Sequence, residues 1–272
     1  METRRVRVSC EFVQFTQAAT PIVMQVRPLQ EAPVVLSQET WTIDPHVETH
    51  AYTDLYENPC LRLTLPVGRS TFRYSAIAEV PDAVEPVDVN APALPADQLP
   101  DDVQIYTLPS RYCVPEMLAE EAVARFGASA PGYQQVQQVL DYVWEHVQFQ
   151  YGSTNSLTTA HDVNVSGLGV CRDFAHPAIS FCRALDIPAR YVFGYLPEID
   201  MEPIANPMDF AAWIEVWLGD RWWTFDPRNN EQRKGRVLIG RGRDASDVAM
   251  VTAFGMPILE SMTVDAREVT GS

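Results

Sequence analysis

The chain has 272 residues, and 46% of them are hydrophobic, which is enough for one large packed core or two smaller ones. Its formal net charge of -16 argues against binding to nucleic acid or to an anionic membrane surface, because either polyanion would repel it. We find neither the apolar segment of a signal peptide nor an apolar run long enough to span a membrane, so we expect a cytoplasmic protein.

The amino-terminal part, residues 1–80, predicts an antiparallel β-sandwich. Short strand-like runs alternate there with Pro, Asn, Asp and Gly, and these runs are VRVSCEFVQF, PIVMQVRP, VVLSQETWTI, LRLTLPV and TFRYSAIAEV. Residues 81–109 contain many prolines and hardly any aromatic side chains, which is typical of an extended, acidic linker. Residues 110–272 would then form a second domain.

Helices and strands are both expected in this second domain, giving an α+β fold. Apolar side chains recur at helical spacing over 115–126, 134–148 and about 171–185, and the last pattern ends shortly before Pro188. The segment FQYGSTNSLTTAHDV, before the third helix, reads as a loop. Strands are predicted at 189–196, 211–218 and 221–226, with one more strand in the last forty residues.

The turn LGDR sets the register of two of these strands. Glycine at the first central position of a two-residue turn is typical of type II′. If Leu218 pairs with Arg221, Trp213 lies opposite Asp226, and position 211 lies diagonal to Asp226 at roughly 7 to 8 Å on the same face. A histidine at that position would be oriented by Asp226, but the sequence has Ala211 there.

Cys171, in GVCRDF, falls at the predicted amino terminus of the third helix. A free cysteine is more often a small buried apolar residue. At a helix start, however, unpaired N–H groups and the helix dipole lower a thiol pKa and can hold an oxyanion. Cys171 is therefore a candidate nucleophile, with its backbone N–H and the Tyr151 hydroxyl as candidate oxyanion donors. Cys182 lies about 16 Å further along the helix, too far for a disulfide, and the five cysteines are expected to be reduced.

The segments GVCRDFAHPAISFCRALDIPARYVFGY and DFAAWIEVWLGDRWWTFDP together resemble the catalytic core of the bacterial transglutaminase-like superfamily. That resemblance covers about residues 159–254, and the first 80 residues resemble the family's amino-terminal β domain. It implies a papain-like core with a Cys-His-Asp triad, in which a D-x-H-A-W motif carries the base and a later F-D-P motif carries the acid. Cys171 matches the nucleophile and Asp226 the acid, while Ala211 occupies the position of the histidine. Asp209 and Trp213, in the first motif, are expected to line the substrate cleft.

In such an enzyme the thiolate attacks an amide or peptide carbonyl, and water or an amine resolves the thioester. The partner implied is a peptide or protein with an amide or glutamine-like group. Loss of the triad base costs on the order of 10⁶ in turnover, so this chain is predicted to be nearly inactive. Because the neighbouring motif residues are intact, we interpret Ala211 as an engineered replacement of histidine. The alternative is a natural pseudoenzyme that binds a peptide or protein partner without turnover.

The other histidines offer no clear substitute for the base. His176 lies five residues after Cys171, about 140° around the helix, and so points away from it. His161 lies in a loop or short helix, and the remaining three are expected to be structural or solvated. No metal-ligand spacing, CxxC, HExxH, GxGxxG or P-loop occurs, so we expect neither a metal nor a nucleotide cofactor.

Overall fold

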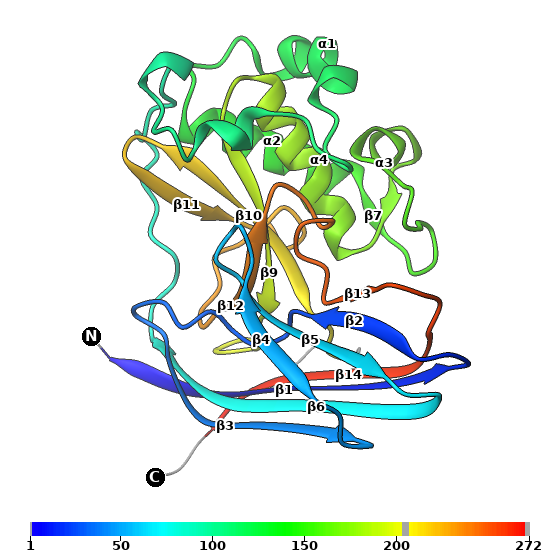
Figure 1. Ribbon diagram of the computed structural model, residues 1–272. Coiled ribbons are helices and arrows are strands. Elements are labelled where there is room, and N and C mark those ends of the chain that lie inside the picture. The colour runs from blue at the N-terminus through cyan, green and yellow to red at the C-terminus, as the bar shows by residue number, and fades with distance from the viewer. Residues whose placement is uncertain (1, 203–206, 270–272) are drawn as a thin grey trace.

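The computed structural model describes residues 2–202 and 207–269, and Figure 1 shows a β-sandwich beside a second sheet that helices cover. The sandwich holds two four-stranded antiparallel sheets, in the orders β14-β1-β6-β3 and β13-β2-β5-β4. Their strands are β1 (Thr3–Thr16), β2 (Thr20–Met24), β3 (Val35–Asp44), β4 (Thr49–Thr53), β5 (Pro59–Leu65), β6 (Gly68–Pro81), β13 (Val251–Ala253) and β14 (Ile258–Glu268). Alternate side chains of β1 point inward, so that Val6, Val8 and Phe12 are buried in the sandwich core. The polar strand β4 was not predicted, because all its side chains are exposed.

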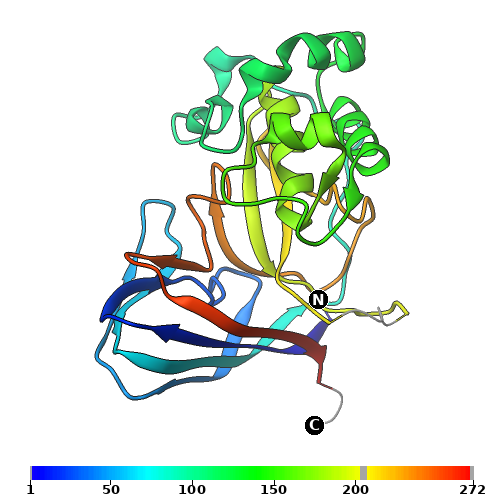
Figure 2. The same cartoon turned by 90° about the vertical axis from the view of Figure 1, so that its right-hand side faces the viewer.

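The sandwich also takes its last strands from the far end of the chain, so the predicted second domain, residues 110–272, extends too far. Strand β14 lies antiparallel to β1, from Val6 opposite Glu268 to Phe15 opposite Ile258. Strand β13 pairs with β2 in the same way. Figure 2 shows the red carboxy-terminal strand running along the blue first strand. The pairing covers edges of β1 and β2 that would otherwise be open, a requirement that leaves no local pattern in the sequence.

Residues 81–109 pack against the second part of the molecule and are not the extended linker that their composition predicts. They form two 3₁₀ turns, Ala96–Gln98 and Gln104–Thr107, and an isolated bridge joins Pro92 to Gly132. Val103 and Tyr106 are buried. The few apolar side chains of this segment are therefore enough to hold it on the core, because each gains free energy by leaving water.

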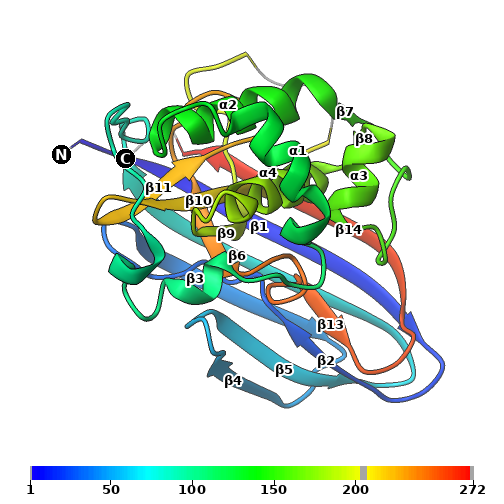
Figure 3. The ribbon, with the colours of Figure 1, turned by 90° about the horizontal axis from the view of Figure 1, so that it is seen from above.

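The second part is an antiparallel sheet, in the order β11-β10-β9-β12, packed against helices. Its elements are α1 (Pro115–Phe126), α2 (Tyr133–His146), α3 (Ala160–Ser166), α4 (Cys171–Ala184), β9 (Ala189–Tyr195), β10 (Ala211–Leu218), β11 (Arg221–Phe225) and β12 (Val237–Gly242), with a two-stranded parallel pair β7 (Gln148–Phe149) and β8 (Leu168–Gly169). Figure 3 shows α4 between the sheet and the other helices. The predicted helix 171–185 and the strands around it are thus present. Among residues 2–202 and 207–269, no helix combines the length and the apolar character that crossing a membrane requires.

Two local features of this part have clear causes. The segment 149–163 was predicted as a loop, but its last residues form the start of the short helix α3. Thr159 caps this helix, because it exchanges reciprocal hydrogen bonds with Asp162. The β10–β11 hairpin has the predicted register, from Leu218 opposite Arg221 to Ile214 opposite Phe225. Gly219 has a φ of 63°, as the first central position of a type II′ turn requires.

The sandwich contacts the sheet where β10 begins. The ring of Phe210 packs 6.3 Å from that of Phe12 in β1 and 5.2 Å from that of Tyr195 in β9. The Tyr195 hydroxyl donates a hydrogen bond to the Val26 carbonyl oxygen, 3.1 Å away. The residue directly before Ala211 is thus held between the two parts of the molecule.

Candidate active site

Cys171 is the first residue of α4, as predicted. The Asp173 carboxylate holds this turn, since it accepts hydrogen bonds from the Val170 N–H at 2.9 Å and from the Thr154 hydroxyl at 2.6 Å. Gly169 allows this close approach, because a Cβ there would lie 2.6 Å from the Asp173 Cβ. The Asp173 N–H donates to the Val170 carbonyl oxygen at 2.8 Å, whereas the N–H groups of the two residues before it have no acceptor within the helix.

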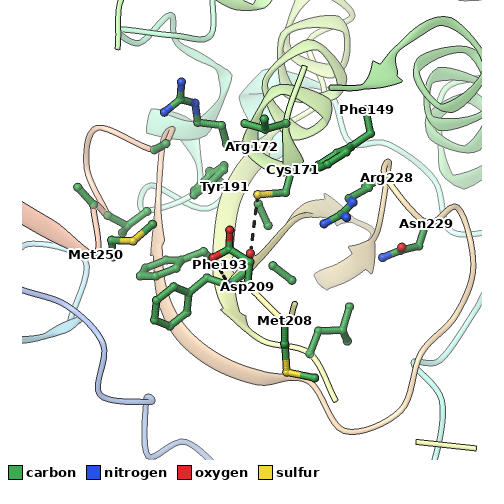
Figure 4. Close-up of a pocket in the computed structure, with 18 of the residues that line it drawn as sticks. Phe149, Cys171, Arg172, Tyr191, Phe193, Met208, Asp209, Arg228, Asn229 and Met250 are labelled. Carbon is green, nitrogen blue, oxygen red and sulfur yellow. Dashed lines mark hydrogen bonds between the residues drawn. The ribbon is translucent and has the colours of Figure 1, made fainter. Parts of the chain in front are cut away.

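A cavity of about 480 Å³ opens beside this helix start, and Figure 4 shows several of its lining residues. Four of the predicted site residues line it, namely Tyr151, Cys171, Asp209 and Ala211. The Cys171 sulfur lies 3.7 Å from the carbonyl oxygen of Phe210. Standard peptide dimensions put that oxygen about 2.8 Å from the next Cα, so the sulfur lies within about 6.5 Å of the Ala211 Cα. This upper limit puts the sulfur within reach of a histidine side chain at position 211.

The Cys171 thiol is neutral around pH 7. Its removal from water raises its pKa to about 11, and the nearby Asp209 carboxylate adds to the increase, while Arg228 opposes it. The thiol proton points to the Phe210 carbonyl oxygen. Burial also raises the pKa of Asp209, whose carboxylate accepts a hydrogen bond of 2.7 Å from the Phe210 N–H. The helix terminus alone therefore does not produce a thiolate here.

Asp226 is buried at the end of β11 and lies outside the lining of this cavity. One carboxylate oxygen accepts the N–H groups of Arg228, at 3.2 Å, and Asn229, at 3.0 Å. The other accepts the Asn229 side-chain amide and the Arg236 guanidinium, both at 2.8 Å. A carboxylate has about four such acceptor positions, and protein groups occupy all of them. A histidine at position 211 would have to displace one of these donors to reach Asp226.

Trp213 does not line the cavity, so its predicted place in the substrate cleft is wrong. It is only 1% exposed. Its ring fills the space over Gly194, where a Cβ would lie 2.9 Å from the ring, and the Arg236 guanidinium carbon lies 4.9 Å from the ring centre. Because Gly194 has no side chain, the Trp213 ring has space beside it, and the pairing of β9 with β10 brings the two residues together.

The other predictions for the site have mixed outcomes. His176 is buried, its ring stacks on that of Tyr112, and burial lowers its pKa to about 4. It lies outside the cavity lining and offers no base for Cys171. The Tyr151 ring is 65% exposed and packs edge-on against Phe149, so its role as an oxyanion donor stays a prediction.

Sequence reasoning missed most of the residues that line the cavity. Arg228 and Asn229 follow Asp226 and Pro227 in the chain, and they line the cavity together with Phe149. The Arg228 guanidinium lies over the Phe149 ring, 4.4 Å from its centre. Arg228 and Asn229 belong to the turn after β11 in which the Asn230 N–H donates to the Asp226 carbonyl oxygen.

Comparisons with known proteins agree with this architecture. Residues 120–227 match the family model described as transglutaminase-like superfamily. A crystal structure from Cytophaga hutchinsonii, described as a candidate cysteine protease, aligns with a TM-score of 0.89 and 28% identity over 100% of this chain and 93% of that one. Its likeness confirms the predicted α+β class.

Two curated mycobacterial proteins, both described as uncharacterized, match part of the chain. The protein of Mycobacterium leprae is 35% identical over 111 residues, which is 39% of this chain and 39% of that protein. The protein of Mycobacterium bovis is 27% identical over 161 residues, or 56% of this chain and 51% of that protein. The match thus spans about half or less of these relatives.

Proposed function

Because residues 120–227 carry a transglutaminase-like superfamily domain, we propose that this chain has the machinery of a cysteine enzyme that acts on amide or peptide bonds. One observation carries the proposal: the Cys171 sulfur and Ala211 share one cavity, with the sulfur 3.7 Å from the oxygen that precedes Ala211. The Cytophaga protein, described as a candidate cysteine protease, supports the same reading. The substrate would be a peptide or protein with an amide or glutamine-like group.

The proposed reaction needs a base at position 211. A histidine there would take the thiol proton, and the sulfur would attack the substrate carbonyl carbon. The proton would then pass to the departing amine or ammonia, leaving an acyl group on the sulfur as a thioester. Water or a second amine would release that group and return the proton to the thiol. An alanine methyl group accepts no proton, and with a thiol pKa of about 11 the chain as it stands is expected to turn over almost no substrate.

We further propose that Ala211 stands where an active form has histidine, by engineering. Asp209, Phe210 and Trp213 keep the motif around it, and Cys171 keeps its place at the helix start. A histidine codon at this position in the encoding gene would support replacement, and an alanine codon would favour natural loss.

A second candidate function is a pseudoenzyme that holds a peptide in the same cavity. One observation favours it: Asp226 is fully hydrogen-bonded without any histidine. In this reading Arg236 and Asn229 have taken the place of the imidazole as partners of the carboxylate.

The variant Ala211→His tests the first function. We expect it to release ammonia or amine from a panel of peptide amides, and iodoacetamide to abolish that release. The double variant Ala211→His/Cys171→Ser is the matched control and should be inactive. Free imidazole added to the unmodified chain should restore a small part of the same activity, because the cavity has room for the ring. If the restored histidine gives no turnover on any peptide, the catalytic proposal fails.

A further inference from the structure

This inference rests on the proposed function. From the cavity we infer that Arg228 forms a carboxylate-binding subsite, so that the preferred ligand presents a carboxylate near the amide bond together with an apolar side chain. The proposed reaction could act on many amide bonds, and this subsite would specify which class of substrate binds.

The first step is that the Arg228 guanidinium forms no ion pair or hydrogen bond with the residues that the structure describes. The guanidinium of Arg172 is hydrogen-bonded to the Asp173 carboxylate and to a backbone oxygen, and Arg233 is paired with Glu231 and the Pro197 carbonyl oxygen. Over residues 2–202 and 207–269, by contrast, no carboxylate oxygen lies within 4.0 Å of the Arg228 guanidinium, and no oxygen accepts a hydrogen bond from it. Among the three arginines that line the cavity, Arg228 is thus the one whose donors face an open space.

The second step is that this guanidinium is held in place. The Phe149 ring lies under it, with 4.4 Å between the guanidinium carbon and the ring centre. The turn that carries Arg228 is closed by two hydrogen bonds, from its own N–H to the Asp226 carboxylate and from the Asn230 N–H to the Asp226 carbonyl oxygen. A donor held in this way loses little conformational entropy when an anion binds.

The third step is the position of this charge beside the sulfur. Figure 4 shows the Arg228 head in the cavity on the side of Cys171 away from Met250. Its field reaches the sulfur, since it opposes the increase that burial causes in the Cys171 pKa. A carboxylate bound to Arg228 would therefore belong to the part of the ligand next to the bond under attack.

Two carboxylates line the cavity and could repel such a ligand, namely Asp209 and Glu198. The Asp209 carboxylate accepts the Phe210 N–H, and burial raises its pKa, which disfavours its charged form, while the Phe210 hydrogen bond and the Arg228 charge oppose that increase. Burial lowers the pKa of Arg233, and the charge of Glu198 opposes that decrease, so Glu198 lies near a cation. Arg228 is left as the cavity arginine whose guanidinium is free to meet an incoming anion.

Apolar walls complete the subsite. The cavity side chains that carry no charge are mainly large and apolar: Tyr191, Phe193, Leu196, Met208, Val248 and Met250. The cavity volume of about 480 Å³ is in the range of small-ligand sites, which commonly combine an apolar lining with a few fixed polar groups. A leucine-sized side chain and a carboxylate can therefore be bound together.

Binding to the unmodified chain tests this without turnover. Probes come in two pairs: N-acetyl-Leu-Leu as free acid and as amide, and N-acetyl-Leu-Glu-amide and N-acetyl-Leu-Gln-amide. The readout is protection of Cys171 from iodoacetamide at pH 9, followed by peptide mass spectrometry. We expect the anionic member of at least one pair to protect at about tenfold lower concentration, as a charge-assisted hydrogen bond provides. The pair that responds shows whether the carboxylate is terminal or on a side chain.

Variants at Arg228 complete the experiment. Arg228→Gln should abolish the preference for the anionic probe, and Arg228→Lys should keep part of it. Arg221→Gln is the matched control, because Arg221 also stacks on an aromatic ring, that of Trp223 at 4.7 Å, but lies outside the cavity; it should keep the full preference.

The subsite is refuted if both members of each pair protect equally, if no probe protects at all, or if Arg228→Gln keeps the preference. Should Arg228→Gln fail to fold, the probe pairs on the unmodified chain and on Arg228→Lys still decide. The subsite and the catalytic proposal fail separately. Turnover by Ala211→His without a carboxylate preference removes only the subsite, and a preference without turnover removes only the catalytic function.

Discussion

Restoring histidine at position 211 should change the ionisation of Cys171 before any substrate is considered. With a pKa of about 11, only about one thiol in 10⁴ is ionised at pH 7. An imidazolium within hydrogen-bonding distance favours the thiolate, and cysteines paired in this way have a pKa below 7. The thiolate fraction would then increase about 10⁴-fold. Nucleophilicity falls as the pKa falls, by about 10² over this range, so alkylation at pH 7 should become about a hundredfold faster.

The assay is the rate of Cys171 alkylation by iodoacetamide between pH 5 and pH 10, measured by mass spectrometry. The other four cysteines are buried and serve as internal references. In the unmodified chain the rate should rise with pH through this whole range, because the thiol pKa lies above it. In Ala211→His it should reach a plateau below pH 8. Ala211→Gln, which adds a polar side chain without a base, should behave like the unmodified chain. An unchanged profile for Ala211→His would refute the assignment of position 211 as the place of the base.

Three further predictions concern stability. Asp226→Asn should lower the free energy of unfolding by about 2 kcal/mol, because buried Arg236 loses one charged partner and keeps only Glu85. Urea denaturation measures this free energy, and an unchanged value would contradict a stabilising ion pair between Asp226 and Arg236. The pKa of His176 falls from 6.5 to about 4 on folding, so the unfolded chain takes up the proton at a higher pH than the folded chain does. The free energy of unfolding should therefore decrease as the pH falls from 6.5 to 4, by up to about 3 kcal/mol. His176→Gln should show a smaller decrease in urea midpoint between pH 7 and pH 4.5, and an equal decrease would assign the effect to other groups. Truncation after Met250 removes β13 and β14 and exposes the edge of β1, so the shortened chain should aggregate, as measured by size-exclusion chromatography. A stable monodisperse product would contradict the role of these two strands in the sandwich.

Local patterns in the sequence were sufficient for much of the candidate site. Helical spacing and the residues before Pro188 defined α4, and with it the place of Cys171 at the first helical position. The two-residue turn at Gly219 determined the pairing of β10 with β11 as far as Ile214 opposite Phe225. These features depend on residues close together in the chain, whose spacing alone decides which face or turn they form.

Contacts between distant segments decided the rest. The space over Gly194 buries Trp213, and Arg236 and Asn229 occupy the Asp226 carboxylate. The turn after β11 puts Arg228 into the cavity, and the pairing of β1 with β14 joins the two ends of the chain in one sheet. Periodicity shows only that a side chain is buried or exposed. Which partner it meets depends on how separate elements pack to exclude water and satisfy their polar groups, and that is settled only when the whole chain has folded.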